Sequence, residues 1–191
     1  MPPKARITRE MILEEAFHIA RTEGADKITA RSISLRLGCS TQPVLYCFAT
    51  VEEIRRAVYE RADAYHGQYL MTLPEDCGDP LTAIGMNYVR FAVEEPQLFR
   101  LLFQTDSLHG ASVPALINQE EIAPVCAVIA QEAGVSPQAA REIFMTLFIF
   151  VHGYASLHAN NAMPFDAAQL AAALKNVFCG AVGAAKGLLP Q

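Results

Sequence analysis

Apolar residues recur every three or four positions along almost the whole chain, which is the period of amphipathic α-helices. Alternating apolar and polar runs bounded by tight turns, the pattern typical of strands, are essentially missing from the sequence. The pattern therefore predicts an all-α fold of about nine helices. The predicted segments lie at about 8–24, 29–38, 40–48, 50–73, 80–94, 96–104, 114–133, 137–160 and 166–187.

Capping residues mark several of the predicted helix ends. Thr8 and Thr29 are good N-cap residues, Gly24 and Gly38 end helices, and Thr50 begins a Thr-Val-Glu-Glu capping box. Four prolines lie near other predicted boundaries, where a missing N–H is tolerated: Pro96, Pro114, Pro137 and Pro164. The residues predicted to be buried in the early helices are Met11, Ile12, Ala16, Ile19, Ala20, Ile33, Leu37, Ile54, Val58, Ala62, Tyr65 and Tyr69.

The composition indicates a compact protein without a metal or disulfide framework. The chain has 191 residues, of which 52% are hydrophobic and 18% are charged, so it can bury a core and is not intrinsically disordered. Five scattered cysteines with no Cys-x-x-Cys pair argue against a disulfide scaffold or a zinc site. No signal peptide or uninterrupted apolar span is recognisable. We expect a cytoplasmic protein with no cofactor, no metal and no membrane partner.

The net charge of −5 argues against nucleic-acid binding only as an average over the whole chain. Residues 1–50 carry seven cations and five acids, whereas residues 51–191 carry eight cations and fifteen acids. The first part is therefore slightly positive and the second strongly negative. This difference favours separate tasks for the two parts.

Residues 28–54 have the organisation of a helix-turn-helix. Two short predicted helices flank the turn Leu37-Gly38-Cys39-Ser40, and a glycine turn allows the second helix to cross the first and enter a major groove. Thr41 and Gln42 begin the second helix, where a glutamine side chain can hydrogen-bond two atoms on the major-groove edge of adenine. An ordinary solvated helix start would explain the same two residues. Between Lys27 and Thr50 there are three cations and no acid.

The first 60 residues resemble the DNA-binding domain of the TetR family of bacterial transcriptional regulators. The resemblance covers the segments ITREMILEEAFHIARTEG, TARSISLRLG, STQPVLYCF and TVEEIRRAVYE. It implies a helix-turn-helix domain at 1–50 and a ligand-binding and dimerisation domain at 51–191. It also implies a homodimer formed through the last two helices, and a small-molecule effector that controls the spacing of the two DNA-reading helices.

The resemblance also implies which residues contact DNA, and two positions depart from the family pattern. The family usually has a tyrosine at the position of Leu45 and a lysine at that of Val51, and both can contact phosphate. Lys4, Arg6, Arg55 or Arg56 could replace the second contact. For single residues a surface, capping or packing role is the alternative. The predicted DNA contacts are Arg31, Ser40, Thr41, Gln42 and Tyr46.

The predicted effector site is an aromatic region of the second domain. Phe148 and His152 are four residues apart on one helix face, so they could give an apolar cavity a polar group. A helix-bundle core would explain the same aromatic residues, and His152 would then be a hydrogen-bonded core residue. The residues predicted to contact the effector are Phe91, Phe99, Phe103, Phe144, Phe148 and His152.

These patterns predict a dimeric transcriptional regulator, a repressor that binds a palindromic DNA operator and is released by a small apolar effector. The alanines and glycines of the last helix suit a dimer interface, although an intramolecular contact would explain them equally well. The alternative function is a helical protein that binds a small molecule or partner and has weakened or lost operator binding. No phosphate loop, His-Glu-x-x-His or Gly-x-Ser-x-Gly motif indicates an enzyme.

Overall fold

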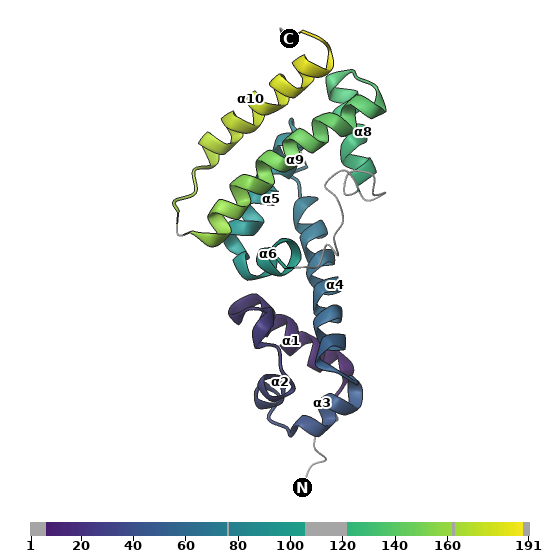
Figure 1. Cartoon of the computed structure of the whole chain (residues 1–191), viewed down its shortest axis with the longest axis vertical. Helices are drawn as coiled ribbons and strands as arrows, with labels where there is room; N and C mark the ends of the chain where they lie inside the picture. Colours follow the sequence, from purple (N-terminus) through teal and green to yellow (C-terminus); the bar gives the residue numbers. More distant parts are fainter. Residues whose placement is uncertain (1–6, 76, 106–121, 162, 189–191) are drawn as a thin grey trace. The chain divides into compact units, whose positions relative to one another are not determined.

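The computed structural model describes residues 7–75, 77–105, 122–161 and 163–188 (Figure 1). In this part of the chain there are nine α-helices, one short 3-10 helix and no strand, which confirms the predicted all-α fold. The predicted start of a helix at Pro114 lies outside the described residues. The helices are α1 (Arg9–Glu23), η1 (Ala25–Lys27), α2 (Ala30–Arg36), α3 (Thr41–Cys47), α4 (Val51–Leu70), α5 (Pro80–Glu94), α6 (Pro96–Phe103), α8 (Ala123–Ala133), α9 (Pro137–Asn160) and α10 (Ala167–Ala185).

Side-chain caps start the first helices where the sequence predicts them. The Thr8 hydroxyl accepts a hydrogen bond from the Met11 N–H at 3.2 Å, and Thr29 forms a reciprocal capping box with Ser32. The predicted box at Thr50 is only half formed. Thr50 accepts the Glu53 N–H, but the Glu53 carboxylate accepts the N–H of Ala49 and not that of Thr50.

The chain divides into two compact units that do not follow a single cut in the sequence. One unit comprises Met1–Gln68 with Glu95–Ser107, and the other comprises Tyr69–Glu94 with Leu108–Gln191. The first unit contains α1–α3, most of α4, and α6. The second contains α5, α8, α9 and α10.

The core of the first unit is formed by one face of each helix around the predicted helix-turn-helix. Four residues predicted to be buried in the early helices are not. Met11 is 37% exposed, and Leu37, Tyr65 and Tyr69 are only half-buried. Helix α1 buries Phe17 in addition to the predicted residues, and α4 buries His66. The buried positions of α4 recur every four residues, and this spacing leads from Ala62 to His66. The largest fully buried side chains of the unit are Ile12, Ile19, Ile28, Ile33, Phe48, Ile54, Leu98, Phe99 and Leu102.

A buried carboxylate joins three helices of the first unit. Glu95, directly before α6, is 6% exposed and accepts two hydrogen bonds from the Arg21 guanidinium of α1, one of them 2.7 Å from Nε to Oε2. The Tyr65 hydroxyl of α4 donates to the same carboxylate at 3.3 Å. Because a buried carboxylate is stable only when it is paired, this cluster holds the start of α6 against α1 and α4.

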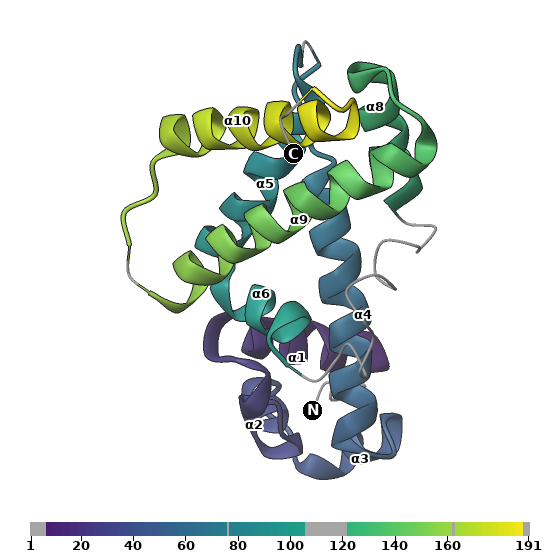
Figure 2. The same cartoon turned by 45° about the horizontal axis from the view of Figure 1, so that its top comes forward.

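The second unit is a layered helix bundle with α9 at its centre. Helix α9 packs against α5, α8 and α10, and Figures 1 and 2 show α10 lying alongside it. A cluster centred on Ile129 and Ile143 forms the core between α8 and α9, and Phe178 of α10 packs against it. Gly85 permits close packing of α5, because an added Cβ would lie 3.1 Å from the Leu174 side chain of α10.

Two helices of this unit expose much of their apolar surface. By length and composition alone α9 and α10 are apolar enough to cross a membrane, but membrane helices and core helices of soluble proteins both meet that criterion. Only 28% of the most apolar window of α9 and 11% of that of α10 are buried. On α9, Ile149 and Leu157 are more than half exposed and lie on one face with Gly153 between them.

Candidate functional site

Helix α3 presents four exposed side chains outward while two apolar residues anchor it to the core. Val44 is fully buried and Phe48, directly after the helix, is 1% exposed. The turn before α3 contains Gly38 with φ +61°, a left-handed conformation that favours glycine. The side chains left outward on α3 are Thr41, Gln42, Leu45 and Tyr46.

Ser40 and Arg31 extend this outward surface. Ser40 occupies the N-cap position of α3, but its hydroxyl makes no capping hydrogen bond and the residue is exposed. Arg31 is exposed in the first turn of α2 and forms no ion pair with the residues that the structure describes. Both side chains are thus available to a phosphate group.

Internal ion pairs reduce the positive charge that the sequence places around α3. Lys27 lies 2.7 Å from an Asp26 oxygen, and Arg36 pairs with Glu23 at 2.6 Å. Both pairs are exposed to solvent, so the paired acids offset only part of the charge of Lys27 and Arg36. In this stretch Arg31 therefore remains the cation best placed to contact a polyanion.

The start of α4 offers one further cation. Arg55 donates to the carbonyl oxygen of Ile28 at 3.2 Å and pairs with Glu52, so its guanidinium already binds two groups of the same unit. Arg56 is exposed and has no ion pair among the described residues. Of the predicted replacements for a lysine at Val51, Arg56 is therefore the better placed, whereas Lys4 and Arg6 lie outside the described residues.

Arg9 fixes the end of α3, and sequence reasoning did not identify this role. Its guanidinium lies 3.9 Å from the centre of the Phe48 ring, donates to the Cys47 carbonyl at 3.1 Å, and pairs with Glu53 at 3.0 Å. These hydrogen bonds to Glu53 from Arg9 and Ala49 lower the pKa of the Glu53 carboxyl. One side chain of α1 thereby connects the end of α3 to the start of α4.

In the second unit, α9 and α5 form an aromatic cluster with one polar pair. Phe144 stacks on Phe148 with 6.0 Å between ring centres, and Phe148 lies 5.5 Å from the His152 ring. The Tyr88 hydroxyl of α5 is hydrogen-bonded to His152 Nδ1 at 3.0 Å. Burial lowers the pKa of His152 and raises the pKa of Tyr88, so the pair is uncharged near neutral pH.

The other three predicted effector residues lie elsewhere. Phe91 is fully buried in the second unit and packs edge-on against Tyr69, with 5.4 Å between ring centres. Phe99 and Phe103 belong to the first unit, where their ring centres are 5.0 Å apart. Three of the six predicted residues, Phe144, Phe148 and His152, are thus brought together. Tyr88 joins them from 64 residues away along the chain, a contact with no signal in the local sequence.

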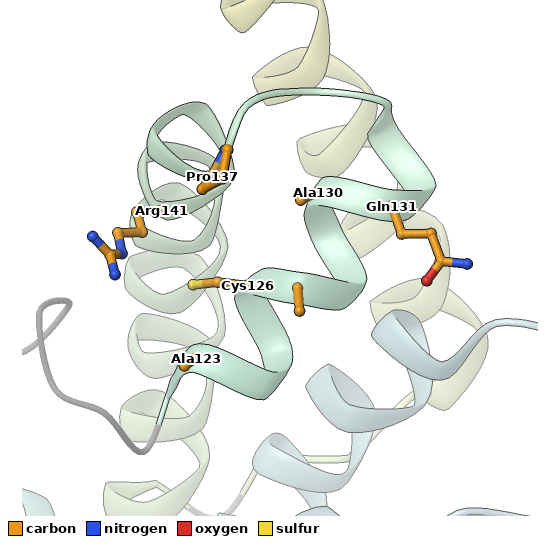
Figure 3. Close-up of a pocket in the computed structure, with 7 residues that line it drawn as sticks. Ala123, Cys126, Ala130, Gln131, Pro137 and Arg141 are labelled. Atoms are coloured by element: carbon orange, nitrogen blue, oxygen red, sulfur yellow. The ribbon is translucent and has the colours of Figure 1, made fainter.

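A separate shallow pocket lies between α8 and the start of α9. Its volume is about 530 Å³, and small apolar residues line most of it. Figure 3 shows the Arg141 and Gln131 side chains extending in opposite directions, so few polar groups converge on it. None of the predicted effector residues is among its lining residues: Ala123, Cys126, Ala127, Ala130, Gln131, Pro137 and Arg141. Within the described residues, no three His, Cys, Asp or Glu side chains form a metal-binding group.

Comparison with known families identifies the second half of the chain. Residues 81–178 match the family model described as "Tetracyclin repressor-like, C-terminal domain". This match covers just over half of the chain and includes α5, α6, α8, α9 and most of α10. The chain belongs to the TetR family. The predicted family membership, which rests mainly on the first 60 residues, is confirmed by a match to a different part of the chain. No curated protein matches this chain.

Proposed function

We propose that this TetR-family protein is a dimeric, cytoplasmic transcriptional repressor that binds a palindromic operator and is released by a small apolar effector. The observation that carries the proposal is the outward face of α3, which presents Thr41 and Gln42 after a glycine turn while Val44 holds the helix to the core. A helix held in this way can enter the major groove and present its first residues to base edges.

The proposed DNA contacts have separate roles. Gln42 hydrogen-bonds an adenine edge and Thr41 contacts a base edge or a phosphate. Arg31, Ser40 and Tyr46 contact phosphates and fix the register of the protein on the duplex. Arg56 supplies a further phosphate contact from α4.

The proposed tasks of the chain divide at residue 50. The helix-turn-helix, residues 1–50, binds DNA, and residues 51–191 bind the effector and form the dimer.

The effector binds against the aromatic cluster of Phe144, Phe148, His152 and Tyr88. There the His152 or Tyr88 side chain can form a hydrogen bond with the effector in place of the bond between them. The family resemblance alone keeps Phe91, Phe99 and Phe103 as proposed effector contacts, since none of them belongs to this cluster. Since a ligand changes an equilibrium only by binding two states differently, the effector must favour the state with lower DNA affinity.

Replacing Gln42 by alanine is expected to weaken specific operator binding about 30-fold or more, because the dimer loses a bidentate adenine contact worth about 1–3 kcal/mol in each of the two half-sites. Binding to unrelated DNA should remain unchanged, since phosphate contacts dominate it. The measurement is a titration of labelled operator and unrelated DNA with both proteins. Gln131→Ala is the matched control, because it removes an exposed glutamine of the second unit. Equal operator affinity for wild type and Gln42→Ala would refute the role of Gln42.

The alternative function is a helical ligand- or partner-binding protein that has lost operator binding. The family departures at Leu45 and Val51, together with the internal pairing of Lys27 and Arg36, are the observations that favour it. Salt dependence separates the two functions. An operator binder loses affinity steeply with salt yet retains sequence preference, whereas the alternative predicts no detectable specific binding at any salt concentration.

A further inference from the structure

Leu45 is an apolar side chain at the centre of an outward helix face. It is 48% exposed, although α3 has only seven residues and buries Val44 directly before it. Gln42 lies three positions earlier and Thr41 four positions earlier, so all three share one face of the helix. The chain therefore exposes a leucine to solvent on the surface proposed to meet DNA.

The charge around Leu45 indicates what covers it. Helices α2 and α3 contain no acidic residue, and exposed Arg31 of α2 has no ion pair among the described residues. A partner with a negatively charged periphery and a small apolar group at its centre fits such a surface. The major groove of DNA has this arrangement, because the 5-methyl group of thymine projects into a groove lined by phosphates.

We infer that Leu45 determines part of the operator sequence by contacting the 5-methyl group of a thymine. This inference rests on the proposed DNA-binding function. Side chains three apart on a helix have Cβ atoms about 5–6 Å apart, and successive base pairs are about 3.4 Å apart. The thymine therefore lies within about two base pairs of the adenine that Gln42 contacts, once in each half-site.

The test begins with selection of binding sites from random duplex DNA by the full-length protein. Each thymine of the selected site is then replaced in turn by deoxyuridine, which removes only the methyl group. We expect one replacement per half-site to weaken wild-type binding about fourfold, the value for burying one methyl-sized group. Leu45→Ala should bind the thymine and deoxyuridine sites equally. Leu35→Ala is the matched control, because Leu35 is 82% exposed on α2, and it should retain the wild-type difference.

The possible results separate this inference from the function on which it rests. If selection enriches no sequence, the proposed function fails and the inference fails with it. If a site is enriched but no deoxyuridine replacement weakens binding, the inference alone is wrong. The inference is also wrong if deoxyuridine still weakens the binding of Leu45→Ala. A sensitive thymine more than two base pairs from the adenine that Gln42 contacts would contradict it as well. So would a Leu45→Ala variant that differs from the wild type only in oligomeric state.

Discussion

Replacing Ile149 and Leu157 together by glutamate is expected to convert the protein from a dimer into a monomer. Both side chains are more than half exposed on one face of α9, and little of the adjacent apolar helix α10 is buried. We propose that a second copy covers this surface through its own α9 and α10. Two carboxylates from each copy would then be desolvated in an apolar interface, which costs several kcal/mol for each ion.

Operator affinity should fall with the loss of the dimer. A monomer contacts one half-site only, and linking two binding modules typically raises affinity by about 10²–10⁴-fold. The measurements are light scattering for oligomeric state and DNA titration for affinity. Met71→Glu is the matched control, because Met71 is 56% exposed in the second unit but lies outside α9 and α10. A double variant that remains dimeric would refute this interface, as would a monomer in both the variant and the wild type.

Acidification is expected to destabilise the protein through His66. This residue is buried in the first unit, where its ring lies 5.1 Å from that of Phe103, and burial lowers its pKa to about 4. The unfolded chain has a histidine pKa of about 6.5, so between these values the unfolded state binds more protons than the folded state. The contribution of neutral His66 to the free energy of unfolding is therefore fully present well above pH 6.5, and it is lost as the pH falls from 6.5 toward 4.

The expected loss of unfolding free energy from His66 between pH 7 and pH 4.5 is about 2 kcal/mol. Urea unfolding of the wild type and of His66→Phe at the two pH values measures it. Phenylalanine can keep the aromatic contact with Phe103 but cannot be protonated. The variant should therefore lose about 2 kcal/mol less than the wild type on acidification. An equal loss in the two proteins would contradict this role for His66.

The sequence predicts the helix boundaries well where a local interaction determines them. Thr8 and Thr29 cap α1 and α2, while Pro96 and Pro137 stand at the first positions of α6 and α9. The prediction is wrong where two neighbouring residues compete for burial. At the end of α4, hydropathy favours Tyr65 over His66, but the four-residue spacing of the buried positions selects the histidine.

The candidate sites are predictable to different extents. The exposed face of α3 follows from the helical period once Val44 is assigned to the core. The contact of Tyr88 with His152 joins residues 64 positions apart, so only the packing of α5 on α9 can establish it. The pairing of Arg36 with Glu23 likewise depends on the crossing of α1 and α2. Charge counted along the sequence therefore overestimates the positive charge available around α3.

We propose that the outward face of α3 reads a specific DNA sequence. The most direct measurement is a titration of the full-length protein against the DNA flanking its own gene, over a series of salt concentrations. Unrelated DNA of equal length serves as the control. We predict saturable binding that weakens steeply with salt and stays at least 10³-fold tighter than binding to unrelated DNA. Equal affinity for the two DNAs at every salt concentration, or no binding to either, would contradict sequence-specific binding by α3.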